Sequence, residues 1–160
     1  MFTDVSQEPI GFAAEEIDQA ASTRDLRLKW VVVVDQALPA GRAVNAAVCV
    51  ASATTTRARG LLGSDAIDAD GGSHPGLPWL GCTVLGAESE RIRAIRAAAA
   101  ERYEIALVDM PTQAQHTRVY DDYLYGVSQC RVRDLDFYAV SLVGPRKTVD
   151  KLVKGLALMP

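Results

Sequence analysis

The chain has 160 residues, 49% of them hydrophobic and 6% aromatic, which suits one domain with a core of Ala, Val, Leu and Ile. The net charge is −3, with six acids and one base in residues 1–25 and no Lys/Arg cluster elsewhere, which makes a nucleic-acid partner improbable. No apolar run approaches the ~20 residues of a membrane span, and without a signal peptide at the N-terminus we expect a cytoplasmic protein.

The chain begins with an acidic, partly ordered arm over residues 1–25, in which residues 11–21 could form a short helix. One α/β domain follows over residues 26–160. The β-branched run from Val31 to Val34 predicts a strand over 29–35 that is covered on both faces. A helix of small apolar residues over 41–59 follows and is expected to pack closely against the sheet or a partner subunit. A Gly-, Asp- and Pro-rich surface loop over 64–78 comes next.

The second half of the chain continues the alternation of strands and helices. Ile92, Ile95 and Ala99 recur at helical spacing and predict one apolar face on a helix. The remaining predicted elements are a strand over 79–85, this helix over 88–102, strands over 103–109 and 136–143 and a helix over 146–155, with a polar and aromatic insertion at 114–135. This order predicts a single three-layer α/β domain with a four-stranded mixed sheet.

The three cysteines, Cys49, Cys82 and Cys130, are widely spaced, so we expect neither disulfides nor a metal site. Cys49 and Cys82 are interpreted as small buried residues. The two histidines, His74 and His116, have no metal-ligand spacing either. The sequence therefore predicts no metal and no cofactor.

Candidate catalytic residues follow the strand at 103–109. Asp109 lies at its carboxyl end, where open α/β sheets place ligands, and Met110-Pro111 turns the chain. Thr112, Gln113 and His116 could then converge on Asp109, whose carboxylate would orient His116 as a general base, while Thr112 and Gln113 are candidate ligand-binding residues. The alternative is that Asp109 braces the turn and that His116 is a plain surface histidine.

Candidate ligand-binding residues lie at the start of the helix at 41–59. Gly41, Arg42 and Asn45 could hold a small anionic ligand, because backbone N–H groups at a helix start attract anions. Arg42 could equally form a surface ion pair. Tyr123, in the insertion, lines either a pocket or a subunit contact, unless the insertion only covers the sheet.

The stretch KWVVVVDQALPAGRAVNAAVCVASA resembles the opening of the type 2 peptidyl-tRNA hydrolases. YEIALVDMPTQ resembles their third strand, and FYAVSLVGPRKTVDKLVKGL their last strand, Gly-Pro turn and final helix. The resemblance covers about 29–113 and 136–155. The insertion, with QHTRVYDDYLYG, is more similar to the uncharacterised DUF two-thousand family, whose fold is similar to that of the hydrolases. The resemblance implies the hydrolase-like fold and a homodimer.

The hydrolases carry Lys, Gln and His where this chain has Val44, Val48 and Ala51. Asp109 matches their aspartate, whereas Thr112 and Gln113 match their Thr-Gln pair only after a one-residue gap. The resemblance therefore implies a ligand-binding or regulatory dimer that lacks most of the catalytic residues, with peptidyl-tRNA hydrolysis weak or absent. The alternative is a hydrolase that acts on a small ester or a peptidyl-tRNA-like substrate through Asp109 and His116.

Overall fold

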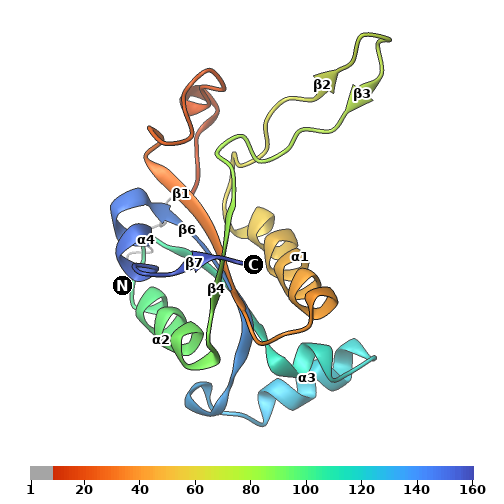
Figure 1. Ribbon diagram of the computed structural model, residues 1–160, viewed down its shortest axis with the longest axis vertical. Helices are drawn as coiled ribbons and strands as arrows, with labels where there is room; N and C mark the ends of the chain where they lie inside the picture. Colours follow the sequence, from red (N-terminus) through yellow and green to blue (C-terminus); the bar gives the residue numbers. More distant parts are fainter. Residues whose placement is uncertain (1–8) are drawn as a thin grey trace, which may run out of the picture.

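A mixed five-stranded sheet forms the centre of the computed structural model, which describes residues 9–160 (Figure 1). The strand order is β5-β6-β1-β4-β7. β1 pairs in parallel with β4 and antiparallel with β6, while β5 pairs antiparallel with β6 and β7 antiparallel with β4. The strands are β1 (Leu28–Asp35), β4 (Thr83–Ala87), β5 (Ala106–Pro111), β6 (Phe137–Pro145) and β7 (Ala157–Leu158).

The predicted four-stranded sheet is therefore one strand short. β7 consists of two residues at the end of the chain and pairs with Leu85 and Gly86 of β4. Two residues are too few to show the period-two pattern by which a strand is predicted from sequence. The prediction of an α/β fold with a mixed sheet is confirmed.

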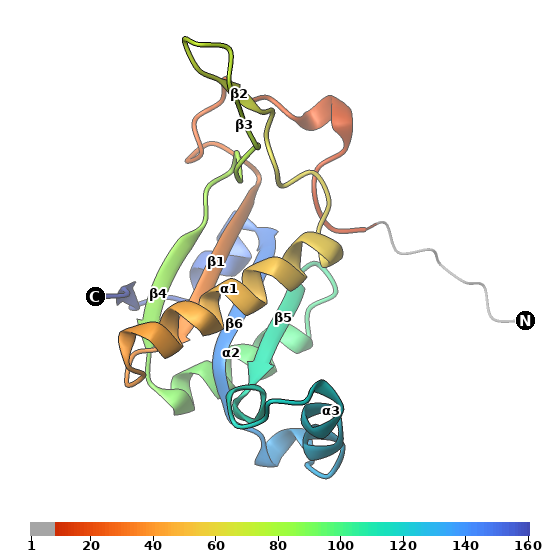
Figure 2. The same cartoon turned by 90° about the vertical axis from the view of Figure 1, so that its right-hand side faces the viewer.

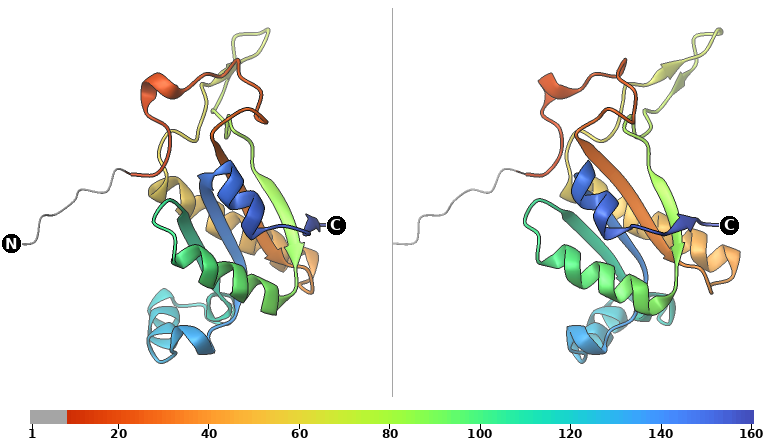
Figure 3. Two further views of the ribbon diagram at one scale, coloured as in Figure 1. Left: turned by 90° about the vertical axis from the view of Figure 1, so that its left-hand side faces the viewer. Right: turned by 60° about the vertical axis from the view of Figure 1, so that its left-hand side comes forward.

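Helices cover both faces of the sheet. α1 lies on one face, and α2 and α4 lie on the other (Figures 1 and 3). The helices are α1 (Ala40–Arg57), α2 (Ser89–Ala100), α3 (Tyr120–Ser128) and α4 (Arg146–Leu152), and the 3-10 turns are η1 (Ala14–Glu16), η2 (Thr112–Gln115) and η3 (Val132–Asp134). α3 lies within the insertion, for which no helix was predicted. No helix in residues 9–160 is long and apolar enough to cross a membrane.

The valine run lies at the centre of both cores, as predicted. Val31 to Val34 are each at most 1% exposed. Because successive side chains of a strand point to opposite faces, Val32 and Val34 pack in the core under α1, whereas Val31 and Val33 pack under α2 and α4. The apolar face predicted for the following helix is also confirmed, since Ile92, Ile95 and Ala99 are all buried.

α1 uses its small residues against the sheet. Ala43, Ala46, Val50 and Thr54 form its buried face. Small side chains allow the helix backbone to approach the strands closely, and the buried stripe is therefore narrow. Cys49 falls outside this stripe and is exposed, as is Cys82, so the prediction that both are buried is wrong.

Two strands begin later than predicted. β4 starts at Thr83 rather than at residue 79, because Trp79 to Cys82 turn before the strand and the indole N–H of Trp79 donates to the carbonyl of Gly60 at 2.7 Å. β5 starts at Ala106 rather than at residue 103 and extends to Pro111. The amide of Ile105 still closes a turn on the carbonyl of Arg102 at 3.2 Å. Hydrogen bonding rather than residue type decides both boundaries.

The Gly- and Asp-rich segment projects from the body of the molecule as a hairpin (Figure 1). We call residues 62–78 the arm. It contains the short strands β2 (Ala66–Ile67) and β3 (Ser73–His74), which pair antiparallel within a region predicted as a loop. At the base of the arm, the amide of Gly63 donates to the carbonyl of Leu77 at 2.8 Å.

The N-terminal segment over residues 1–25, which the sequence predicts to be acidic and partly ordered, is separate from the hairpin at 62–78. Its residues 9–25 pack against the domain, while residues 1–8 lie outside the described residues. Instead of a helix over 11–21 it has the single turn η1. Phe12 is buried and tilts against the ring of Trp79, with ring centroids 4.7 Å apart. The amide of Phe12 donates to the carbonyl of Arg59 at 3.0 Å. This segment therefore adds an aromatic side chain to the core under α1.

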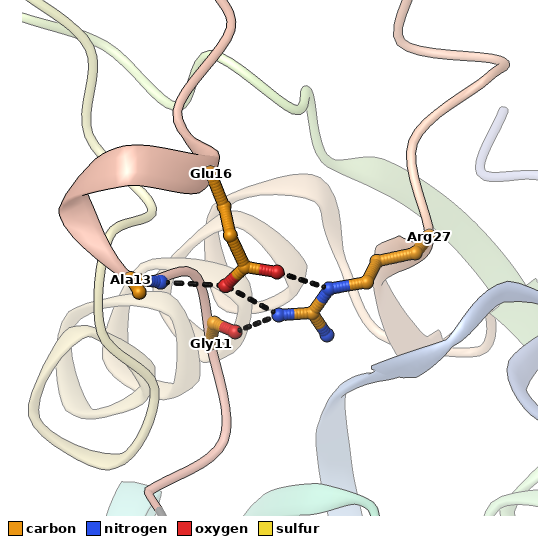
Figure 4. A network of polar contacts seen from close by, with 4 residues as sticks. All are labelled: Gly11, Ala13, Glu16 and Arg27. Atoms are coloured by element: carbon orange, nitrogen blue, oxygen red, sulfur yellow. Dashed lines mark hydrogen bonds and ion pairs between the residues drawn. The ribbon is translucent and has the colours of Figure 1, made fainter.

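Arg27 fastens this segment to the start of β1 (Figure 4). Its Nε and Nη2 donate to the two carboxylate oxygens of Glu16 at 2.8 Å each, and Nη2 also donates to the carbonyl of Gly11 at 2.7 Å. The amide of Ala13 donates to the same carboxylate at 2.7 Å. Hydrogen bonds from Arg27, and then from Ala13, lower the pKa of Glu16 from 4.5 to about 2.

The depressed pKa of Glu16 predicts a pH window for this contact. The contact contributes stability above pH 4.5, and the contribution is lost as the pH falls toward 2, because protonation removes the charge that Arg27 binds. An NMR titration of the Glu16 carboxyl carbon is expected to show a midpoint about 2 in the native protein. Arg27→Gln is expected to move this midpoint upward. A midpoint near 4.5 in the unmodified protein would contradict the contact.

Candidate functional site

A groove of about 820 Å³ lies on the α1 side of the sheet, between α1, β5 and the start of α3. Figure 2 shows α1 lying across this face, with β5 beside it and α3 beyond the end of β5. The groove is bordered by polar side chains from three elements and has an apolar floor. The polar and aromatic lining residues are Asn45, Cys49, Ser52, Thr56, Asp109, Thr117, Arg118, Tyr120 and Tyr123.

α1 supplies the polar wall. Asn45, Cys49, Ser52 and Thr56 follow one another at intervals of four, three and four residues, so they lie along one side of the helix. All four residues are exposed, on a different side of the helix from the stripe that packs on the sheet. The spacing is visible in the sequence, and a search for polar residues at helical spacing would have found Cys49, Ser52 and Thr56. Of these four residues, only Asn45 was predicted.

Asp109 borders the groove on β5, but its carboxylate is engaged on the other side of the sheet. Arg96 of α2 donates from Nε to Asp109 at 2.8 Å, and the two side chains are about a quarter exposed, 25% and 22%. The guanidinium of Arg96 also lies over the ring of Phe137, 5.5 Å from its centroid. β5 is an edge strand, so Asp109 can reach α2 and still line the groove.

His116 follows η2 and has a different partner. Its Nε2 lies 3.3 Å from the hydroxyl of Tyr138, and the two rings meet edge to face. Within residues 9–160, no hydrogen bond or ion pair joins His116 to Asp109. The structure thus does not bring together the two residues predicted to act in proton transfer.

The start of α1 is tied to η2 by Gln115, which was not predicted. The side-chain amide of Gln115 donates to the carbonyl of Arg42 at 2.9 Å and to the side-chain oxygen of Asn45 at 3.0 Å. Asn45 therefore lies both at this junction and in the groove. Gly41 and Arg42 are exposed and are not among the residues that line the groove.

Thr112 and Gln113 belong to η2 and are not among the residues that line the groove. The amide of Thr112 donates to the carbonyl of Asp136 at 3.0 Å. The side-chain nitrogen of Gln113 lies 3.7 Å from the sulfur of Cys130, just beyond the end of α3. Together with Asp109 and His116, these residues surround the end of β5 without converging on one point.

Tyr123 and Arg118 come from the insertion and reach the groove. The pKa of the Tyr123 hydroxyl is raised, first by burial and then by the nearby Tyr120 and Asp109. The hydroxyl therefore stays protonated at neutral pH and can donate a hydrogen bond. Arg118 is exposed, and its guanidinium takes part in no ion pair within residues 9–160. The groove thus offers one cation, a neutral phenol and a second aromatic ring.

The described residues contain no group of three or more His, Cys, Asp or Glu side chains that could hold a metal ion. The groove lacks the ligand set of a metal centre, and its chemistry is that of hydrogen bonding, ring stacking and one positive charge.

Comparisons with known proteins agree with this fold. Residues 28–160 match the family model described as "Protein of unknown function (DUF2000)". The fold is similar to the solved structure of a protein of unknown function from Agrobacterium tumefaciens strain C58, with a TM-score of 0.75 and 20% sequence identity. The match covers 84% of this chain and 99% of that chain. No curated protein matches the chain.

Proposed function

Because the chain belongs to the DUF2000 family of proteins of unknown function, we propose a function from its groove: the protein binds a small anionic ligand without catalysing its hydrolysis. The observation that carries this proposal is the engagement of Asp109. Its carboxylate is held by Arg96 at 2.8 Å, whereas His116 contacts Tyr138. A general base such as His116 needs a second group, here Asp109, to orient it, and no such pair is present at the groove.

The groove itself supports ligand binding. Its volume of about 820 Å³ falls in the range of small-molecule sites, which combine an apolar lining with a few polar groups. Val48, Val108 and Met110 supply apolar surface, and Arg118 supplies a positive charge at the border. A molecule with an aromatic or aliphatic part and one carboxylate or phosphate matches this arrangement. Tyr120 and Tyr123 would contact the apolar part.

The proposal includes the fold and assembly implied by the resemblance to type 2 peptidyl-tRNA hydrolases. Two positions at which those enzymes carry Lys and Gln are occupied here by Val44 and Val48, which are both exposed on α1. Val48 lines the groove. A valine side chain cannot donate or accept a hydrogen bond or carry a proton. A groove with the shape of the hydrolase site would therefore lack the side chains needed for hydrolysis. The proposed assembly is a homodimer.

Substitution of Arg118 tests the ligand. With phenyl phosphate and benzoate as probes, calorimetry is expected to detect binding that Arg118→Gln weakens about 10- to 100-fold, the effect of losing a charged hydrogen bond. Arg24→Gln, an exposed arginine on the N-terminal segment, is the matched control and is expected to bind normally. Bound probe should also slow alkylation of Cys49, which lies in the groove. Cys82 lies outside the groove, and because burial raises its pKa to about 11, it is expected to react slowly with or without the probe.

Two outcomes would overturn the proposal. If neither probe binds and Cys49 and Cys82 are alkylated at unchanged rates, the proposal that the groove binds an anionic ligand is wrong. Turnover of diacetyl-lysyl-tRNA or of a small ester at a rate typical of type 2 hydrolases, abolished by Asp109→Asn, would instead establish catalysis. Loss of a positioned acid or base typically costs ~10²–10⁴-fold in rate, so a groove without these groups is expected to fall well below that activity.

A further inference from the structure

Gln115 fixes how the side chain of Asn45 lies at the border of the groove beside α1. The side-chain nitrogen of Gln115 donates to the carbonyl of Arg42 at 2.9 Å and to the side-chain oxygen of Asn45 at 3.0 Å. A backbone carbonyl can only accept, so it selects the nitrogen of Gln115 rather than its oxygen. Both N–H groups of that nitrogen are then in use, and Asn45 turns its own oxygen toward them.

Neither amide can be turned over without losing these hydrogen bonds. A turned Gln115 would place its oxygen against the carbonyl of Arg42, and two acceptors cannot bond to each other. A turned Asn45 would place N–H groups against the N–H groups of Gln115. The side-chain oxygen of Gln115 is buried and has no hydrogen-bond partner within residues 9–160, so the two bonds of its nitrogen decide how the amide lies.

The free part of Asn45 is therefore a pair of N–H donors. Within residues 9–160, nothing accepts a hydrogen bond from the side-chain nitrogen of Asn45. Asn45 lines the groove, whereas Gln115, toward which its oxygen points, does not. Oxygen and nitrogen lie on opposite branches of the planar amide, so the nitrogen is the branch left to face the groove.

The charged groups of the groove favour the same kind of ligand. Arg118 offers only N–H groups, because a guanidinium has no acceptor. Among the described residues that line the groove, Asp109 has the only carboxylate, and Arg96 holds it at 2.8 Å. An ammonium group in the groove would thus meet N–H donors at Asn45 and Arg118 and no free carboxylate. A carboxylate or phosphate would find donors at both.

We propose that Asn45 determines which ligands the groove accepts, by donating its two N–H groups to a carboxylate or phosphate oxygen, and that Gln115 is the positioning residue that turns them toward the ligand. The inference rests on the proposed function and deepens it. It names the group that recognises the oxygen atoms of the anion, in addition to the charge of Arg118. It also predicts that ligands with an ammonium group are rejected.

Substitution of Asn45 tests the recognition by calorimetry. Asn45→Ala is expected to weaken binding of phenyl phosphate and benzoate about 10- to 100-fold, the effect of losing a hydrogen bond to a charged group. Asn45→Asp has the same shape and still accepts from Gln115, but it turns a carboxylate oxygen toward the groove. It is expected to weaken both probes on the order of 100-fold or more, because like charges then face each other. It should also bind benzylamine, which the unmodified protein is expected not to bind.

Gln115→Glu tests the positioning. The carboxylate of a glutamate only accepts, so Asn45 would turn its N–H groups toward it and its oxygen toward the groove. Binding of both anionic probes is expected to weaken about 10- to 100-fold, although Gln115 does not line the groove. In the Asn45→Ala background, Gln115→Glu should have little further effect. Gln129→Glu, at an exposed position just after α3, adds the same charge and is expected to bind normally.

An NMR measurement reads the Asn45 amide directly. Asn45 is the single asparagine of the chain, so asparagine labelled with ¹⁵N in its side chain gives one pair of amide proton signals. Phenyl phosphate is expected to shift this pair downfield in the unmodified protein and to leave it nearly unmoved in Gln115→Glu. Melting temperatures verify that each variant is folded. If Gln115→Glu unfolds the protein, the two Asn45 variants and the signals of the unmodified protein decide the role of Asn45.

The outcomes separate this inference from the proposed function. Probe binding that Arg118→Gln weakens, but that both Asn45 variants leave unchanged, would overturn the role of Asn45 and leave the anionic ligand standing. Absence of binding by both anionic probes would overturn both. Equal losses from Gln115→Glu with and without the Asn45 side chain would show that residue 115 acts through its charge and does not position Asn45.

Discussion

Replacing Leu142 by alanine is expected to lower the free energy of unfolding by about 2–5 kcal/mol. Leu142 is fully buried in the middle of β6, the strand between β5 and β1, where it pairs with Leu107 and Val31. Alanine would leave a cavity between the sheet and the helices α2 and α4, and a sheet braced by two neighbouring strands cannot collapse to fill it. For a chain of this length, the melting temperature would fall by roughly 4–20 °C.

Leu124→Ala provides the matched control. The same side chain is removed from α3, where Leu124 is half exposed, so the expected cost is about 1 kcal/mol or less. Urea denaturation of both variants measures the difference. Equal losses of stability would mean that β6 is not packed as the structure describes.

A buried chain of hydroxyl groups predicts the second large effect. Trp30 donates from its indole N–H to the hydroxyl of Ser141 at 2.8 Å, and the hydroxyl oxygens of Ser141 and Thr54 are 2.7 Å apart. Thr54 has a single hydroxyl hydrogen and also lies 2.6 Å from the carbonyl of Val50. The arrangement that satisfies every group runs from Trp30 to Ser141, then to Thr54, then to Val50. It joins β1, β6 and α1 in the core.

Thr54→Val keeps the shape of the side chain and removes its hydroxyl. The hydroxyl of Ser141 then has no acceptor in a region that water does not reach, which is expected to cost about 1–3 kcal/mol of unfolding free energy. Thr55→Val, one position further along α1 and exposed, is the control and should change stability by about 0.5 kcal/mol or less.

A double-mutant cycle with Ser141→Ala tests the direction of the chain. When Ser141 has lost its hydroxyl, Thr54→Val leaves no buried hydroxyl without a hydrogen-bond acceptor. Thr54→Val is therefore expected to lower the free energy of unfolding by less than it does in the unmodified protein. Strictly additive effects of the two substitutions would show that the two hydroxyls do not form one connected chain.

The apolar core was largely predictable from sequence. The run from Val31 to Val34 and the helical spacing of Ile92, Ile95 and Ala99 each identify buried side chains from local sequence alone. A strand or helix with such a pattern can bury its apolar side chains only by turning them toward the core. The polar interior was not predictable in the same way. Ser141 reads as an ordinary residue within an apolar strand, and only the fold shows that Trp30 and Thr54 lie beside it.

The candidate site shows the same difference between local and long-range information. That Asp109 lies near the end of a strand was deducible, but that Arg96 holds it requires knowing that α2 packs beside an edge strand. The polar side of α1 was present in the spacing of Asn45, Cys49, Ser52 and Thr56. Arg118 and Tyr120 could not be placed, because their position depends on how the insertion folds around η2 and α3.

The position of β1 in the sheet has a consequence for synthesis of the chain on the ribosome. β1 is made early, but its antiparallel neighbour β6 pairs Pro145 with Leu28, so the sheet cannot close until nearly the whole chain has emerged. Contacts between such distant segments make folding slow. Until then, the valine run of β1 lacks one neighbour and is a site for aggregation. A nascent chain that stops before residue 137 would therefore expose this strand to chaperones and proteases rather than fold.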